Sequence, residues 1–131
     1  MANAQQVSAE LERFVEQLMV KITLDLTANL IETTPVDVGW ARANWIPEIG
    51  LRDIEPAPRP EGGGAAGANA AQALAVSTVI AQYRFPEKIQ VGNGVPYIGV
   101  LNDGHSAQAP AGFVQRAINK TLTSDLQGLA T

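Results

Sequence analysis

The sequence contains no cysteine and a single histidine, His105. Without cysteine the chain can form no disulfide, no thiolate metal site and no thiol nucleophile. One histidine excludes a metal site built from several histidines and a relay between two imidazoles. We therefore expect no cofactor and no resident metal ion.

Basic residues and long apolar runs are also scarce. Nine lysines and arginines face thirteen aspartates and glutamates, which gives a net charge of −4. A classical nucleic-acid reader needs a basic face to neutralise phosphates, so a DNA-binding accessory protein is disfavoured. No apolar run approaches the roughly 20 residues that span a bilayer, and residues 1–6 lack the pattern of a signal peptide. We expect a soluble, intracellular protein with no membrane partner.

The charge is unevenly distributed along the chain. Residues 1–66 carry ten acidic and five basic side chains, whereas residues 67–131 carry three acidic and four basic ones. Opposite signs on the two halves of a small subunit would favour head-to-tail packing in a ring. Ordinary scatter of surface charge is the simpler interpretation.

The length of 131 residues corresponds to one domain, in which we expect residues 1–7 to be a flexible N-terminus. Apolar residues recur at three- and four-residue steps over residues 8–32, which predicts a helix with Ser8 as its N-cap. Pro35 cannot continue this helix. Its length would be about 37 Å, more than a compact domain of this mass needs. We therefore expect part of it to pack outside its own subunit.

Two further segments follow this helix. Residues 45–51 are typical of a strand, near a sheet edge because Pro47 cannot donate a hydrogen bond to a neighbour. Residues 52–68 are rich first in proline and then in glycine, which predicts an extended loop. A loop of this length inside a small domain is generally functional or disordered.

The second half of the chain predicts two helices and two short strands. Small residues over 69–84 indicate a helix, and residues 88–91 and 97–101 are β-type runs joined by a Gly-Asn-Gly turn. Pro110 opens a last helix. Its predicted buried side consists of Phe113, Val114, Ala117, Ile118, Leu122 and Leu126. The fold class is therefore α+β, with a long N-terminal helix and two further helices packed on a small antiparallel sheet.

Candidate catalytic groups are few. Asp103, His105 and Ser106 are the residue types of a hydrolytic triad, but they are neighbours on one turn, whereas a triad converges from separate elements. Asp103 and His105 also offer a metal ion two ligands and no third. The glycine-rich residues 62–67 lack the lysine that a phosphate-binding loop requires. We predict that the chain is not an enzyme, with a small hydrolase or ligand-binding domain using the Asp103–His105 turn as the alternative.

Two tryptophans flank an arginine in the segment after the first helix. Aromatic residues and arginine are enriched where proteins dock on partners, although indoles equally fill cores. Trp45 is the expected core residue. Trp40 is the expected contact residue, next to Arg42.

Three blocks of the sequence resemble, in order, segments of the tail-completion or neck proteins of long-tailed bacteriophages. Residues 34–45 (TPVDVGWARANW) are similar to that family's pattern TPVDTGxLRxSW. Residues 89–98 (IQVGNGVPYI) are similar to VxxxNxVPYA. Residues 102–106 (NDGHS) and 108–114 (QAPAGFV) are similar to EyGhSxQAPxGmv, which leads into a last helix. The succession of blocks covers about residues 8–126.

The sequence departs from the family pattern at four positions. Asn102 and Asp103 stand where the family has an acidic and an aromatic residue. Val38 and Trp40 replace a threonine and a basic or polar residue. These departures would alter contacts with partners without changing the fold.

The resemblance implies a non-enzymatic virion protein, made in the cytoplasm of the host bacterium. Such proteins form a ring at the head–tail junction, for which a hexamer is favoured and a dodecamer is the alternative. The ring would join the portal-connector complex to the tail tube, with a connector or stopper protein and a tail-terminator or tail-tube protein as its neighbours. Genome DNA would pass through without sequence-specific binding. A tail-terminator ring is the alternative within the same class.

The long loop is expected to order only on assembly. Its acidic residues Asp53, Glu55 and Glu61 would repel passing DNA, which suits a conduit. The candidate assembly residues are Trp40, Arg42, Asp53, Glu55, Arg59, Glu61, Asp103 and His105.

Overall fold

The computed structural model describes residues 3–34, 40–51, 66–96, 98–103 and 111–130. Its elements, in chain order, are α1 (Ala4–Thr33), α2 (Trp40–Ala43), β1 (Trp45–Ile49), α3 (Ala66–Gln82), β2 (Ile89–Asn93), α4 (Ile98–Asn102) and α5 (Phe113–Ala130). The predicted α+β class is confirmed, because three long helices pack with a small antiparallel sheet. The predicted loop over residues 52–68 lies outside the described residues, except that residues 66–68 begin α3.

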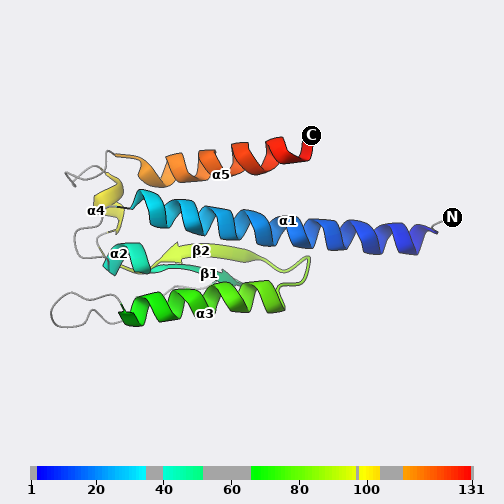
Figure 1. Cartoon of the computed structure of the whole chain (residues 1–131), viewed down its shortest axis with the longest axis horizontal. Helices are drawn as coiled ribbons and strands as arrows, with labels where there is room; N and C mark the ends of the chain where they lie inside the picture. The colour runs from blue at the N-terminus through cyan, green and yellow to red at the C-terminus, as the bar shows by residue number, and fades with distance from the viewer. Residues whose placement is uncertain (1–2, 35–39, 52–65, 97, 104–110, 131) are drawn as a thin grey trace.

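The elements stack in the order α5, α1, sheet and α3 (Figure 1). α1 packs against α5 on one side and against both strands on the other, while α3 packs against β1. α5 runs antiparallel to α1 (Figure 1). The core lies where these layers meet. It consists of Leu30, Trp45, Phe113 and Ala117, with Leu26, Ile31, Val91, Ile98 and Val114 packed against them.

α1 begins four residues earlier than the sequence predicted. Asn3, and not Ser8, is its N-cap, since the Asn3 side chain accepts a hydrogen bond of 2.9 Å from the backbone amide of Gln6. The Gln6 side chain in turn accepts one of 2.9 Å from the Asn3 amide, which completes a capping box. Residues 4–7, expected in a flexible N-terminus, therefore form the first turn of α1.

The sheet joins two segments that are far apart in the sequence. β1 and β2 pair antiparallel, in a register that runs from Trp45↔Asn93 to Ile49↔Ile89. Pro47 lies opposite Val91. With two described strands, each strand has one unpaired edge, and such an edge accommodates a residue that has no N–H to donate.

The predicted strand over residues 97–101 is wrong for residues 98–101, which belong to α4. The Asn93 side chain ends β2: its oxygen accepts a 3.0 Å hydrogen bond from the Val95 amide, and its nitrogen donates one of 2.8 Å to the Ala41 carbonyl. The Ile98 amide then donates to the Val95 carbonyl at 3.2 Å, which begins a helical turn. The predicted Gly-Asn-Gly hairpin is wrong for the same reason.

α5 buries a different row of residues from the predicted one. Phe113 and Ala117 are buried as predicted, and Val114 packs on the core. The row then continues with Thr121 and Asp125, at four-residue steps, because their polar groups find partners on α1. The predicted buried residues that prove to be exposed are Ile118, Leu122 and Leu126.

Candidate assembly surface

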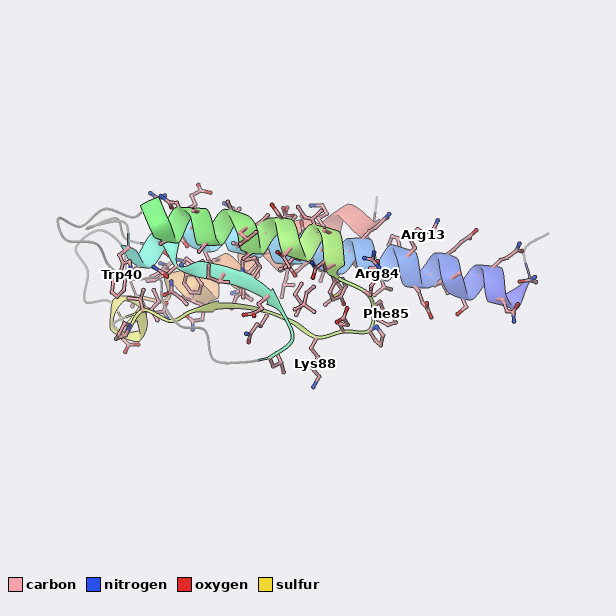
Figure 2. All side chains as sticks on the ribbon, turned by 90° about the horizontal axis from the view of Figure 1, so that it is seen from below. Arg13, Trp40, Arg84, Phe85 and Lys88 are labelled. Atoms are coloured by element: carbon pink, nitrogen blue, oxygen red, sulfur yellow. The ribbon has the colours of Figure 1, made fainter. Side chains whose placement is uncertain are left out.

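Three of the eight predicted assembly residues are among the described residues: Trp40 and Arg42 in α2, and Asp103 directly after α4. The other five lie outside them, namely Asp53, Glu55, Arg59, Glu61 and His105. α2 and α4 lie at one end of the molecule, opposite the start of α1 (Figure 1). Trp40 is half-buried at this end of the molecule, where Figure 2 labels it. Asp103 is exposed.

Arg42 has a role within its own chain. Its Nε donates a hydrogen bond of 2.6 Å to the Ile31 carbonyl, and its Nη2 donates one of 3.3 Å to the Glu32 carbonyl. Both carbonyls belong to the last turn of α1, where unpaired acceptors and the helix dipole favour a cation. Arg42 therefore fastens α2 to the end of α1 within its own chain.

Trp45 is the core residue that the sequence predicted. It is 5% exposed, and its indole nitrogen donates a 2.7 Å hydrogen bond to the hydroxyl of Thr34, which is also buried. The indole thereby places its large apolar ring in the core and satisfies its one polar group.

Asn102 positions α5, a role that its place in the sequence did not indicate. Its carbonyl accepts a 2.7 Å hydrogen bond from the Gly112 amide, and its side-chain oxygen accepts one of 3.0 Å from the Val114 amide. Gly112 has a φ of 80°, a left-handed conformation that a side chain disfavours. These three residues fix the direction in which α5 leaves α4.

α1 projects beyond the rest of the fold. Residues 4–14 are all exposed, and Figure 1 shows this part of α1 continuing past the ends of α3, α5 and the sheet. Figure 2 shows Arg13 on it, nearer the N-terminus of α1 than the neighbouring Arg84 and Phe85. At 1.5 Å per residue the segment is roughly 16 Å long. We name residues 4–14 the α1 extension.

An apolar stripe runs along the α1 extension. Val7, Leu11 and Phe14 are 45%, 60% and 50% exposed, and their i, i+4, i+7 spacing puts them on one helix face. We name these three residues the α1 stripe. The same three- and four-residue steps lead on to Lys21 and Asp25, where this face meets α5. The α1 stripe is thus the uncovered continuation of the face on which α5 packs.

α5 carries a second apolar stripe. The α5 stripe consists of Ile118, Leu122, Leu126 and Leu129, which are 38%, 40%, 51% and 48% exposed. Its first members follow one position after the buried Ala117 and Thr121, so the stripe is rotated by about 100° from the face toward α1. Within the described part of the chain, no element covers it.

Two carboxyls and a lysine form a polar cluster between α1 and α5. Lys21 Nζ lies 2.6 Å from Asp25 Oδ2 and 3.1 Å from Asp125 Oδ1, and Asp125 is buried. Burial, helped by the hydrogen bond to Asp25, raises the pKa of the Asp125 carboxyl against the opposing effect of Lys21. Burial also acts to raise the pKa of Asp25, but hydrogen bonds from Lys21 and Asp125 outweigh it and lower that pKa. Asp125 is therefore the carboxyl that takes up a proton first.

The cluster does not extend to a metal site. Among the described residues, no group of three or more histidine, cysteine, aspartate or glutamate side chains is placed to hold a metal ion. Nor do the described ranges contain a helix that is both long and apolar enough to cross a membrane. What the arrangement offers is exposed apolar surface on α1 and α5, with Leu74 and Ile80 also exposed on α3.

Comparisons with protein-family models, with curated proteins and with solved structures gave no match to this chain.

Proposed function

We propose that this protein is a structural component of a bacteriophage virion, which forms a ring at the head–tail junction. The ring joins the portal-connector complex to the tail tube and forms part of the channel for the genome. The resemblance of three ordered sequence blocks to neck proteins supports this proposal. The same resemblance supports the proposals that the protein has no catalytic activity and that it is present in the assembled particle.

The structural observation that carries the proposal is the exposure of the α1 extension. A single domain gains no core from residues 4–14, because all of them are exposed. Yet the extension presents three large apolar side chains on one face, and water-exposed apolar surface of this kind is typical of a surface that binds another protein. A subunit that works by joining others has a use for such a helix.

The net charge of −4 fits a conduit better than a DNA-binding protein. A channel through which DNA moves must not retain phosphates, and acidic subunits repel them. The acidic loop residues Asp53, Glu55 and Glu61, which the sequence analysis assigned to this role, lie outside the described residues. Their ordering on assembly stays a prediction. Equal proteolytic cleavage of residues 52–68 in free and assembled protein would count against it.

Electron microscopy of particles made without this protein tests the proposal. We expect DNA-filled heads and finished tails that do not join, and joined particles when the wild-type chain is supplied in the same lysate. Complete, infectious particles in the absence of the protein would overturn the proposal. Heads that fail to fill, or tails that fail to form, would assign the protein to a different stage of assembly.

A further inference from the structure

We propose that the outer edge of β2 is an interaction surface for a second copy of this chain. The two copies pair through their β2 strands, antiparallel and related by a two-fold axis, so that two two-stranded sheets become one four-stranded sheet. This inference is independent of the proposed function, because it concerns how the chain pairs in solution, whether or not a phage particle is present.

The register of the sheet decides which backbone groups of β2 point outward. The Gly50 amide donates a 2.7 Å hydrogen bond to the Lys88 carbonyl, which makes these two residues a hydrogen-bonded pair. Such pairs alternate with non-bonded pairs in an antiparallel ladder, so Ile89, Val91 and Asn93 lie at non-bonded positions. Their N–H and C=O groups point away from β1. We name these outward-pointing backbone groups the β2 edge.

The β2 edge is open to a further strand. The described part of the chain supplies no hydrogen-bond partner to the backbone groups of Ile89 and Val91. β1 lies between α3 and β2 in both views, so α3 is on the far side of the sheet from this edge (Figure 1, Figure 2). All five residues of β2 are half-buried. An unpaired edge of this kind binds an extended chain through main-chain hydrogen bonds, and a two-stranded sheet gains stability from added strands.

The outer edge of β1, in contrast, is closed. Pro47 lies at an outward-pointing position of β1, is buried and has no N–H to donate. The Trp45 carbonyl accepts a 2.9 Å hydrogen bond from the side chain of Gln72 on α3, which packs against β1. Proline and a covering helix are devices by which proteins prevent strand addition. Strand pairing between copies is therefore confined to β2, and it stops at a closed dimer instead of continuing into a fibre.

A second copy fits the β2 edge because this edge is complementary to itself. When the two-fold axis passes beside Val91, Ile89 of one copy lies opposite Asn93 of the other, and the two Val91 residues lie opposite each other. Each outward N–H then meets an outward C=O. Residues 89–93 contain no charged residue and no proline, so neither repulsion nor a missing donor opposes the pairing.

The nearest charge on the strand is also compatible with this arrangement. Lys88 directly precedes β2, and in the two-fold register it lies opposite Gly94 of the other copy. The two Lys88 residues are thus offset by six positions, which is roughly 20 Å along the strands. Their repulsion is largely screened at this separation in physiological salt.

Hydrogen exchange of the wild-type chain, followed by NMR at several protein concentrations, tests the proposal. Light scattering gives the mass of each sample, 13.8 kDa for the monomer or twice that for the dimer. The amides of Gln90 and Gly92 point toward β1 and should be protected in both states. The amides of Ile89 and Val91 should exchange quickly in monomeric samples and at least about tenfold more slowly in dimeric ones.

Three results of this experiment overturn the proposal. A chain that stays monomeric at every concentration has no second copy on the β2 edge. Fast exchange of Ile89 and Val91 in a dimer places the dimer contact elsewhere. Slow exchange of these two amides in a monomer means that the same chain covers the edge.

Two proline variants compare the two edges of the sheet. Ile89→Pro removes an outward N–H from the β2 edge, and Ile49→Pro removes one from the residue directly opposite on β1. Both are half-buried isoleucines, and proline is tolerated where a strand residue donates nothing to the ladder. We expect Ile89→Pro to raise the dimer dissociation constant at least about tenfold, because two hydrogen bonds per dimer are lost. Ile49→Pro should dimerise like the wild type, and equal dissociation constants for the two variants would overturn the proposal.

An isotope-filtered NOE experiment checks the register in the wild-type chain, and so does not depend on the folding of any variant. In a mixture of labelled and unlabelled chains, the Hα atoms of Gln90 in one copy and Gly92 in the other should give an intermolecular NOE, since they form a close non-bonded pair. Intermolecular NOEs that involve the α1 stripe or the α5 stripe, and not β2, would assign the dimer to a helix surface and reject the strand pairing.

Discussion

Lys21 on α1 and Asp125 on α5 form an ion pair of 3.1 Å, although they are 104 positions apart in the sequence. The pair lies at the point where α5 covers the face of α1 that continues outward as the α1 stripe. Packing of the first helix on the last therefore includes ionisable groups, and the stability of this pairing depends on pH.

We expect the free energy of unfolding of the Asp125→Asn variant, relative to the wild type, to increase as the pH rises from about 3 to neutral. The pKa of Asp125 is raised above its ordinary value of 3.8, mainly by burial. The Asp125 carboxyl therefore contributes its full stabilisation below pH 3.8, and this contribution is lost as the pH rises through the raised pKa. Guanidinium unfolding at several pH values measures the difference.

Asp25→Asn is the matched control with the opposite sign. Although burial opposes it, hydrogen bonding to Lys21 and Asp125 lowers the pKa of Asp25. Its contribution is present above 3.8 and is lost as the pH falls through the lowered pKa. We expect this variant to lose most stability near neutral pH. Identical pH profiles for the two variants would contradict the assigned protonation order.

Phe113→Ala is expected to lower the free energy of unfolding by about 3–5 kcal/mol. Phe113 is fully buried in the core at the start of α5, so its removal leaves a cavity. Phe14→Ala, on the α1 extension, removes the same atoms from an exposed site and should cost less than about 1 kcal/mol. Urea unfolding of both variants checks the assignment, which equal losses would refute.

Arg42→Ala is expected to destabilise the isolated chain by roughly 1–2 kcal/mol, because two carbonyls at the end of α1 lose their charged donor. Arg13→Ala, on the exposed α1 extension, serves as the control and should be nearly neutral. Thermal unfolding measures both. An Arg42→Ala variant as stable as the wild type would contradict this role within the chain and would make Arg42 a candidate contact with a partner again.

His105→Ala is expected to leave joined particles unaffected, because the proposed role requires no proton transfer or metal ligation. A hydrolase that used the Asp103–His105 turn would lose its activity with this change. Counting joined particles by electron microscopy after complementation with the variant separates the two functions. Loss of joined particles would contradict this expectation and would make the imidazole an assembly contact, the other role that the sequence predicts for His105.

The sequence was sufficient to predict the elements with strong periodicity. Apolar steps predicted α1 and α5, small residues predicted α3, and β-type runs predicted β1 and β2. A helix longer than the domain needs was also predicted, and α1 does project beyond the other elements (Figure 1). What the extension contacts stays a prediction.

The errors arose where polar groups decide the packing. Thr121 is buried because its hydroxyl accepts a 2.8 Å hydrogen bond from Asn29, and Asp125 is buried beside Lys21. The apolar pattern alone places Thr121 and Asp125 on the solvent side of the helix. The predicted buried face of α5 was therefore the α5 stripe, and not the face that packs on α1. The capping box at Asn3 was missed for a similar reason, since its partner Gln6 also lies outside the apolar pattern.

The proposed place of this chain in a virion can be tested directly by electron microscopy of purified phage whose copy of the protein carries a gold-binding tag. We predict label at a single site per particle, between the portal vertex and the first ring of the tail tube. Particles without label, made from cells in which the tagged chain is abundant and acts on a small molecule, would contradict the proposed structural role.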